Sequence, residues 1–336
     1  MVNSTAKRRL LSRFLVRLAA VAAVLALAIT VQSSSSESVR FAAEPRPGES
    51  VQAELVRLQQ QTGLSLATFG FGFNVVLFDK RSLVQIPIST GSALVTGSIS
   101  RDGTKIIVKR FDPSASDSLE LLRTDGSDER EFPLTRASEM RSGVESLCWS
   151  YDESRLAMGV HRGSPEVKLE ILDLKPGVEV TVDPGMKQLS SQCWSPDDKG
   201  IVYEAGDGVR TYEVGNEKSS ALLAPGGKAP TWSPDGNWIA FREGDTFYEI
   251  RPDGRDKKKL FHRKDVYSPL WWSPDSHFVA YVSLARFALD DVYELRARRL
   301  ADDSEGRIAE GQISGDYQWL ISPQLARQAG SETKLH

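Results

Sequence analysis

Short apolar runs separated by polar turns follow one another along most of the chain, and one of these turns recurs. Residues 232–241 read Trp-Ser-Pro-Asp-Gly-Asn-Trp-Ile-Ala-Phe. Proline presets φ, aspartate accepts hydrogen bonds from nearby backbone, and glycine takes positive φ, so Ser-Pro-Asp-Gly is a turn signal. An aromatic residue before this turn and a β-prone run after it predict two antiparallel strands.

The turn belongs to a repeat that has an anchor residue, Trp232 in this copy, and an apolar trio that begins seven residues later. The other copies are anchored at Ile99, Trp149, Trp194, Trp272 and Ile313, at intervals of 38 to 50 residues. The units continue with a third strand, a turn and a fourth strand, as at residues 247–250 and 259–261. Repeats of this period with four strands each are typical of β-propeller blades.

The two ends of the repeat region complement each other. Only 23 residues follow Ile313, while residues 74–86 carry the pattern of a third strand, a turn and a fourth strand. We therefore predict an all-β fold, a six-bladed β-propeller over residues 66–323. Its last blade is expected to be a composite of two strands from each end of the domain, which leaves no unpaired seam.

The N-terminal segment has the pattern of an export signal. Residues 1–17 are basic, and residues 18–31 are continuously apolar. This apolar run is shorter than the ~20 residues that cross a bilayer. Residues 1–31 are therefore either a cleaved signal peptide or a retained membrane anchor. Residues 32–65 are predicted to be a polar linker with one short amphipathic helix, and residues 324–336 a C-terminal tail.

Charge argues against nucleic-acid binding. The formal net charge is −3, and residues 32–336 hold 37 basic against 45 acidic residues. A nucleic-acid binder would present a basic face. One basic cluster stands out, formed by Arg255, Lys257, Lys258, Lys259, Arg263 and Lys264. We interpret it as a solvated outer strand; the alternative is contact with an anionic partner or lipid head groups.

Catalytic and metal-binding motifs are not found in the sequence. There is no G-x-S-x-G nucleophile motif and no phosphate-binding loop, and the four histidines lack metal-ligand spacing, so no metal or cofactor is expected. The turn aspartates are interpreted as local turn stabilisers; they are Asp102, Asp152, Asp197, Asp235, Asp275 and Asp316.

Two cysteines occupy the same repeat position. Cys148 and Cys193 each precede an anchor tryptophan, so we expect them on the inner strands of neighbouring blades. A disulfide requires Cα atoms within about 7 Å. Equivalent positions on neighbouring blades are usually further apart, and we therefore predict two free, partly buried thiols.

Trp271 is a candidate binding residue because it breaks the repeat. It stands where other copies have Cys148, Cys193 or Thr231. If Trp272 points into the blade interface, strand alternation places Trp271 on the opposite face. Tyr267, in the loop before it, would supply a second aromatic side chain at the mouth of the channel. The alternative for Trp271 is ordinary packing against the next blade.

The repeat resembles that of TolB-like β-propellers. The match is full at residues 232–241, near-full after Trp194 and Trp272, and partial elsewhere, and it covers about residues 66–323. In that family a six-bladed propeller follows a smaller α/β domain and binds a lipoprotein partner at one end of its channel. Residues 32–65 are too few for such a domain. Similar blades occur in prolyl-oligopeptidase-type and tricorn-type peptidases and in a few propeller lyases.

The resemblance and the motifs together imply a function. We expect an exported, non-enzymatic propeller, a monomer, that acts as a scaffold for an envelope protein or a peptide-like ligand at one propeller mouth. It would be periplasmic, or membrane-anchored with the propeller outside the cytoplasm. The alternative is an enzyme with its site in the propeller mouth, as in a propeller lyase or a peptidase-associated propeller.

Overall fold

The chain divides into two compact units, residues 1–42 and 43–336. The computed structural model describes residues 48–69, 73–86, 94–110, 118–124, 129–133, 143–161, 167–175, 179–186, 191–216, 220–266, 268–286, 292–311 and 317–322, all in the second unit. The predicted export segment and the C-terminal tail lie outside these ranges. Within them, no helix is long and apolar enough to cross a membrane.

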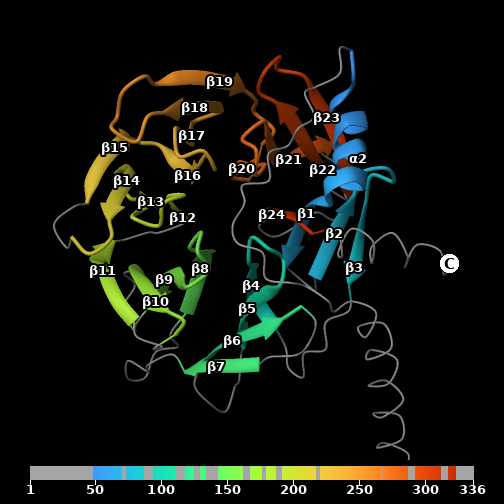
Figure 1. Cartoon of the computed structure of the whole chain (residues 1–336). Helices are drawn as coiled ribbons and strands as arrows, with labels where there is room; N and C mark the ends of the chain where they lie inside the picture. Colours follow the sequence, from blue (N-terminus) through green and yellow to red (C-terminus); the bar gives the residue numbers. More distant parts are fainter. Residues whose placement is uncertain are drawn as a thin grey trace, which may run out of the picture. The chain divides into compact units, whose positions relative to one another are not determined.

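The described strands form six four-stranded antiparallel sheets, called sheets I to VI here (Figure 1). Sheet I contains β24 (Tyr317–Ile321), β1 (Leu64–Phe69), β2 (Phe73–Leu77) and β3 (Ser82–Ile86). Sheet II contains β4 (Leu94–Ile99), β5 (Lys105–Arg110), β6 (Ser118–Arg123) and β7 (Glu129–Pro133). Sheet III contains β8 (Gly143–Trp149), β9 (Arg155–His161), β10 (Val167–Asp173) and β11 (Glu179–Met186).

The other three sheets follow the same order. Sheet IV contains β12 (Gln192–Trp194), β13 (Gly200–Ala205), β14 (Gly208–Glu213) and β15 (Ala221–Pro225). Sheet V contains β16 (Lys228–Trp232), β17 (Ile239–Glu243), β18 (Thr246–Ile250) and β19 (Lys258–His262). Sheet VI contains β20 (Trp271–Trp272), β21 (Phe278–Arg286), β22 (Val292–Arg299) and β23 (Glu305–Gly311).

The first strands of the sheets lie innermost and contact one another in sequence. β4 contacts β8, β8 contacts β12, and the series continues through β16 and β20 to β24, while β1 contacts β4. Figure 1 shows these strands gathered around the centre of the second unit, with β7, β11, β15 and β19 outside. The arrangement is an all-β, propeller-like fold.

Sheet I joins the two ends of the described chain, but in a different proportion from the predicted one. β24 pairs with β1 in antiparallel register, with Trp319 opposite Leu66. The sheet thus takes one strand from the C-terminal end and three from the N-terminal end, not two from each. The prediction missed β1, because Leu64–Phe69 lies just before the stretch that matches a third and fourth strand.

The anchor of this last unit is Trp319, so the predicted anchor Ile313 is wrong. In the other sheets the anchor pairs with a residue seven positions later, as Trp194 pairs with Ile201. Trp319 instead pairs across the two ends of the chain, and its indole N–H donates to the Trp271 carbonyl at 3.0 Å. The indoles of Trp149 and Trp194 make the equivalent bonds to the preceding sheet. Residues 313–316 lie outside the described ranges.

The anchors build the core between sheets. The side chain of Trp194 is fully buried in a cluster that contains Leu169 and Ile171 of sheet III. Trp272 is buried with Phe247 and Phe261 of sheet V. These anchors fill the space between their own sheet and the preceding one. The hydrophobic effect therefore holds neighbouring sheets together.

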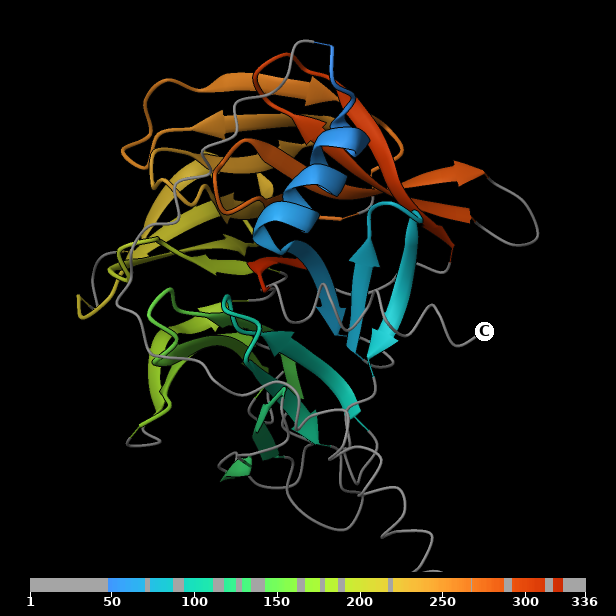
Figure 2. The same cartoon turned by 45° about the vertical axis from the view of Figure 1, so that its right-hand side comes forward.

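Helix α2 (Val51–Thr62) packs against β1, β22 and β23 (Figure 2). Ser50 caps its first turn, and Gly63 ends it with a φ of 75°. Its buried Glu54 lies 3.0 Å from the Arg299 guanidinium of β22. Burial raises the pKa of Glu54, while Arg299 opposes that rise. The helix thereby covers parts of sheets I and VI.

The Ser-x-Asp turns share one hydrogen-bond pattern. In sheet V the Ser233 hydroxyl donates to Asp235 at 2.5 Å and accepts from the Trp238 amide at 2.9 Å. The Asn237 amide donates to the same carboxylate. The equivalent serine-to-aspartate bonds join Ser100 to Asp102, Ser150 to Asp152, Ser195 to Asp197 and Ser273 to Asp275. These aspartates therefore hold turns; Asp316 lies outside the described residues.

The residue after each turn aspartate has positive φ, and where it carries a side chain it reaches the preceding sheet. Asp198 accepts the amide N–H groups of Tyr151 and Asp152, with the latter at 2.9 Å. Glu153 accepts from the Asp102 amide, and Ser276 from the Asp235 amide. We call these contacts turn latches, because each ties the turn of one sheet to the turn of its neighbour.

The strand β24 should be essential for stability. Deleting residues 312–336 removes buried Trp319 and Leu320 and leaves one edge of β1, the edge that faces β24, unpaired. We expect a loss on the order of the whole stability of a domain, ~5–15 kcal/mol, and aggregation. Deleting only residues 329–336, a polar and glycine-containing segment, should be nearly neutral. Thermal unfolding of both truncations checks this; equal, near-native melting temperatures would contradict it.

A second prediction concerns the turn latches. Replacing Asp198 by Ala leaves two amide donors of sheet III without their acceptor, and we expect a loss of about 1–2 kcal/mol. Asp256→Ala is the matched control. Asp256 also has positive φ and is exposed, but its described contact is a 3.6 Å ion pair with Arg251 of the same sheet. Denaturant titration should separate the two variants, and equal losses would argue against the latch.

A third prediction follows from the protonation of the turn aspartates. Burial would raise the pKa of Asp235, but hydrogen bonds from Asn237 and Ser233 hold it below the usual value. A lowered folded-state pKa adds stability above the unfolded-state pKa of about 3.9, and this stability is lost as pH falls. Asp235→Asn removes the titrating group. The difference in free energy of unfolding between wild type and variant should be constant above about pH 5. Below about pH 4 the wild type should lose stability relative to the variant. Thermal unfolding at several pH values measures this, and a difference that does not change with pH would contradict it.

Candidate functional site

A cavity of about 440 Å³ lies where the inner strands of the six sheets converge, and every sheet contributes to its lining. The residue before each anchor faces it. These six residues, called the cavity ring here, are Ser98, Cys148, Cys193, Thr231, Trp271 and Gln318. Strand alternation explains the placement, because the anchor side chain points between sheets and its neighbour points the other way.

The anchors also fix the backbone of the cavity ring. The indole N–H of Trp149 donates to the carbonyl of Ser98, and that of Trp194 to the carbonyl of Cys148, both at 3.2 Å. Each bond crosses from one sheet to the preceding one. The core between the sheets therefore positions the residues that line the cavity.

Trp271 lines the cavity, as strand alternation predicts, and packs against Tyr317 from sheet I. The ring centroids lie 5.1 Å apart with an interplanar angle of 58°. Tyr317 is only 3% exposed, yet its hydroxyl has no hydrogen-bond partner among the described residues. Burial raises its pKa, so it stays protonated at neutral pH and can donate a hydrogen bond. Tyr267 lies outside the described residues.

Arg101 and Tyr151 form a second pair at the cavity, one that sequence reasoning missed. Both occupy the middle position of a Ser-x-Asp turn, where sheets IV, V and VI have proline. The Arg101 guanidinium carbon lies 3.2 Å from the centroid of the Tyr151 ring, a cation–π contact. The sequence does contain a signal for this pair. Both residues replace the proline found at the same position in the other copies of the turn.

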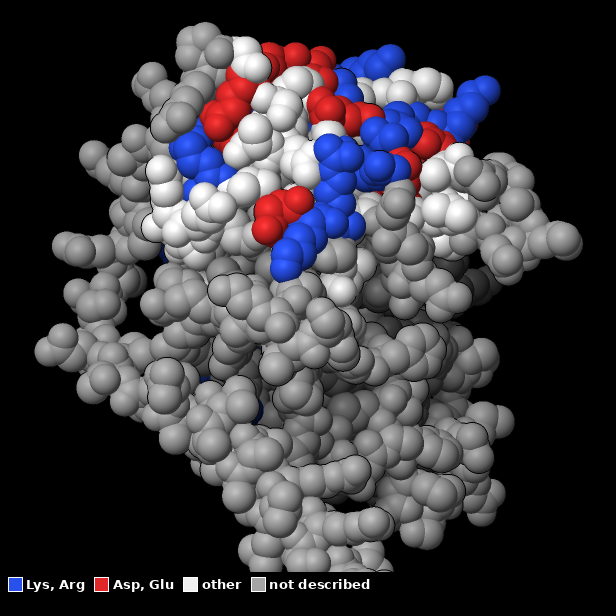
Figure 3. Space-filling view, turned by 90° about the vertical axis from the view of Figure 1, so that its right-hand side faces the viewer, with Lys and Arg blue, Asp and Glu red and all other residues white. Residues whose placement is uncertain are grey.

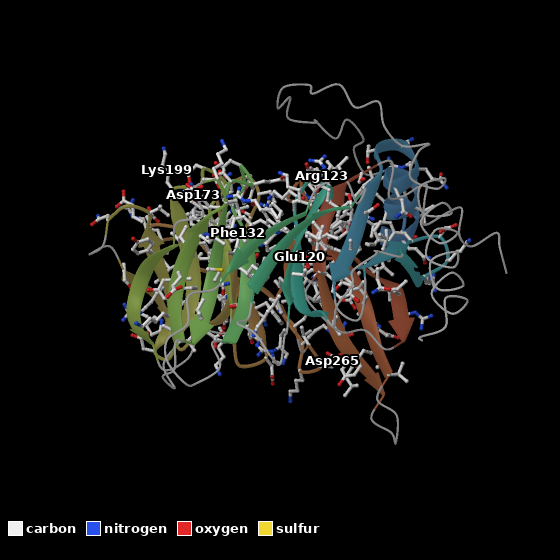
Figure 4. The ribbon with its side chains drawn as sticks, turned by 90° about the horizontal axis from the view of Figure 1, so that it is seen from below. Glu120, Arg123, Phe132, Asp173, Lys199 and Asp265 are labelled. Carbon is white, nitrogen blue, oxygen red and sulfur yellow. The ribbon has the colours of Figure 1, made fainter. Side chains whose placement is uncertain are left out.

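The two ends of the cavity carry different groups. Figure 4 shows Lys199, next to a Ser-x-Asp turn, and Asp265 at opposite ends of the sheets. Arg101 belongs to the turn end. Arg242 belongs to the other end, where it donates to the carbonyl of Val266 at 3.0 Å. Lys228 of β16 lies opposite Arg242 of β17 in the strand register, so it belongs to the same end.

The charged groups of the described lining are mostly cationic. The described lining contains three cationic side chains, Arg101, Lys228 and Arg242, and one carboxylate. That carboxylate, Glu204, accepts the Ala229 amide at 2.8 Å. This balance is opposite to the negative charge of the whole chain. The cavity should therefore favour a ligand with an anionic group.

Cys148 and Cys193 are neighbours in the cavity ring, and both are free thiols of intermediate exposure. The thiol of Cys148 donates to the carbonyl of Trp149 at 3.6 Å, and that of Cys193 donates to the carbonyl of Trp194 at 3.5 Å. The influence of the two thiols on each other raises the pKa of Cys148 and lowers that of Cys193.

The basic cluster on and beside the outer strand β19 is largely paired. Lys257 lies 2.6 Å from Glu243, and Lys258 lies 2.7 Å from Glu249 and also over the ring of Trp238. Arg263 bonds to Asp265 and Glu305. These contacts agree with a solvated outer strand more closely than with a free anion-binding surface.

A further charged network lies on sheet VI. The guanidinium of Arg296 bonds to Glu294 and Glu305, and Arg298 lies 3.3 Å from Glu305. Figure 3 shows blue and red side chains intermixed on the described part of this side of the molecule. Because the two signs are interspersed, this face offers no broad patch of one charge. Within the described ranges, no group of three or more His, Cys, Asp or Glu could hold a metal ion.

Comparison with solved structures identifies the fold. The chain is similar to a putative TolB from Agrobacterium tumefaciens, with 16% identity and a TM-score of 0.56 over 74% of this chain and 88% of that one. It is similar to TolB from Acinetobacter baumannii, with 13% identity and a TM-score of 0.58 over 76% and 66%. It is also similar to an oligogalacturonate lyase in complex with manganese, with 13% identity and a TM-score of 0.54 over 72% of each chain.

Sequence comparison gives no closer relation. No family model matches the chain, and no curated protein matches it. The similarity therefore rests on the arrangement of strands, which agrees with the repeat and with the inner strands around a cavity. The chain has the fold of the TolB-like β-propellers.

Proposed function

We propose that this chain is an exported, non-enzymatic, six-bladed propeller that binds a peptide-like segment of an envelope protein in its central cavity. Sheets I to VI are the six blades, and the pairing of β24 with β1 closes the ring with strands from both ends of the domain. The propeller acts as a monomeric scaffold outside the cytoplasm. Residues 1–31 deliver it there, as a signal peptide or as an anchor.

The observation that carries the proposal is the cavity itself. Its volume of about 440 Å³ falls within the ~300–1,000 Å³ of ligand sites. Its wall joins an aromatic pair, Trp271 and Tyr317, to hydroxyl groups that have no partner in the described part of the chain, those of Tyr317 and Ser191. Such a wall can take up an apolar side chain and hydrogen-bond a peptide backbone beside it.

The charges of the lining indicate which chemical groups the ligand should carry. Arg101 lies at the turn end and Lys228 and Arg242 at the other, so an acidic side chain or a terminal carboxylate finds a cation at either end. A guanidinium or ammonium group pairs well with a carboxylate in a partly enclosed site. We therefore expect a peptide segment that combines an apolar or aromatic residue with an acidic group.

The alternative is an enzyme whose site lies in the propeller mouth, and the similarity to an oligogalacturonate lyase favours testing it. The purified chain would be incubated with oligogalacturonate, with and without manganese, and unsaturated products measured. If the wild-type chain cleaves oligogalacturonate and Trp271→Ala does not, the enzymatic proposal would replace the binding proposal. Absence of turnover in a chain that retains a partner would support the scaffold.

The proposed function gives a fourth prediction. Trp271→Ala removes the aromatic surface that packs on Tyr317, and we expect at least a tenfold loss of ligand affinity, about 1.4 kcal/mol or more. Trp238→Ala is the control, because Trp238 is also a partly exposed tryptophan but lies under Lys258 on sheet V and does not line the cavity.

The measurement is crosslinking of the purified chain in envelope extract, with the crosslinked peptides mapped. The proposal requires crosslinks at cavity-lining residues in wild type and in Trp238→Ala, and their loss in Trp271→Ala. Crosslinks that map only to outer strands, or equal yields from all three proteins, would contradict it.

A further inference from the structure

The cavity ring contains two adjacent cysteines, and their surroundings differ from those of its other members. Cys148 is the second-last residue of β8 and Cys193 lies in β12, so the two thiols come from sheets III and IV. β8 and β12 contact each other, and both cysteines line the same cavity. The intermediate exposure of both residues and their position in the cavity wall give a small reagent access to them.

The backbones that carry the two thiols are held together from both sides. The Trp194 indole N–H donates to the Cys148 carbonyl at 3.2 Å. Before the cysteines, the Ser146 hydroxyl donates to the Gln192 side chain at 2.7 Å, and the Gln192 amide donates to the Ala157 carbonyl. β8 and β12 are therefore fixed next to each other, and both thiols belong to the same part of the cavity wall.

The groups around Cys193 favour its thiolate. The Cys148 thiol and the Thr231 hydroxyl are polar neighbours that favour its charged form, and the Arg101 guanidinium adds a positive charge nearby. These contacts lower the pKa of Cys193 although burial opposes the change. Cys148 is the opposite case, because the neighbouring Cys193 and burial both raise its pKa. A thiolate next to a protonated thiol is the arrangement of reactive dithiols.

We propose that Cys148 and Cys193 are a redox-active dithiol, which thiol–disulfide exchange converts to a disulfide joining sheets III and IV. Cys193 is the attacking thiolate and Cys148 the resolving thiol. The oxidant is a low-molecular-weight disulfide or the disulfide of a thiol oxidoreductase. Export would deliver the chain to a compartment where such oxidants act.

The exchange balances in two steps. The Cys193 thiolate attacks one sulfur of the oxidant, forms a mixed disulfide and releases the first thiolate. Cys148 then loses its proton and attacks the Cys193 sulfur, which releases the second thiolate. The two protons of the original thiols end on the two released thiolates. The cysteines lose two electrons, and the oxidant disulfide gains them.

The product would change the wall of the cavity. Two of the six cavity-ring side chains would be joined and their hydrogen-bonding groups removed. The link would also close a loop between residues 148 and 193 and thereby restrict the unfolded chain. The oxidised protein should therefore melt at a higher temperature than the reduced one.

The fifth prediction tests the dithiol with the full chain, purified under reducing conditions. The probe is oxidised glutathione at neutral pH; remaining thiols are then blocked, and the chain is digested without reductant for mass spectrometry. We expect a peptide containing Cys148 linked to one containing Cys193 in monomeric protein. Cys148→Ser should trap one glutathione on Cys193. Cys193→Ser should acquire glutathione on Cys148 at least tenfold more slowly.

Several results would overturn the proposal. They are two unmodified thiols after prolonged oxidation of a chain shown to be folded, glutathione on both cysteines without a link between them, or disulfides only between separate chains. Equal rates for the two single variants would overturn the assignment of Cys193 as the attacking thiolate.

Discussion

The pairing of β24 with β1 is the interaction on which the rest of the structure depends. Five residues from one end of the described chain hydrogen-bond to a strand more than two hundred residues away in sequence. Trp319 and Leu320 become buried in this contact. The same strand builds the site, because Tyr317 packs on Trp271 and the Trp319 indole binds the Trp271 carbonyl. Fold and cavity wall thus share one element.

Much of the architecture was predictable because each repeat carries its own turn chemistry. The buried serine, the aspartate and the positive-φ residue act within a few positions, so the sequence pattern alone locates the hairpin in sheets II to VI. The sixth anchor could not be found in this way. The partner strand of Trp319 comes from the other end of the chain, so no Ser-x-Asp turn follows it.

The candidate site was predictable only in part. Alternation next to Trp272 correctly places Trp271 in the cavity wall. The contact of Arg101 with Tyr151 depends on two turns in different sheets, about fifty residues apart in sequence. The placement of the two thiols in one part of the cavity wall likewise depends on the contact between β8 and β12. A repeat assigns each residue to an equivalent position, but it does not say which neighbouring positions touch.

The turn latches are unevenly distributed, because Gly236, like Gly103 in sheet II, has no side chain to form one. It occupies the position from which Glu153, Asp198 and Ser276 reach the preceding turn, and a Cβ there would face Pro196 of sheet IV at 3.8 Å. Sheets II, III and IV are thus joined turn to turn, as are sheets V and VI. Among the described residues, no such latch joins sheets IV and V or sheets I and II. Under an outward load on the cavity wall, the boundaries beside Gly236 and Gly103, which lack a described latch, should therefore open before the latched ones.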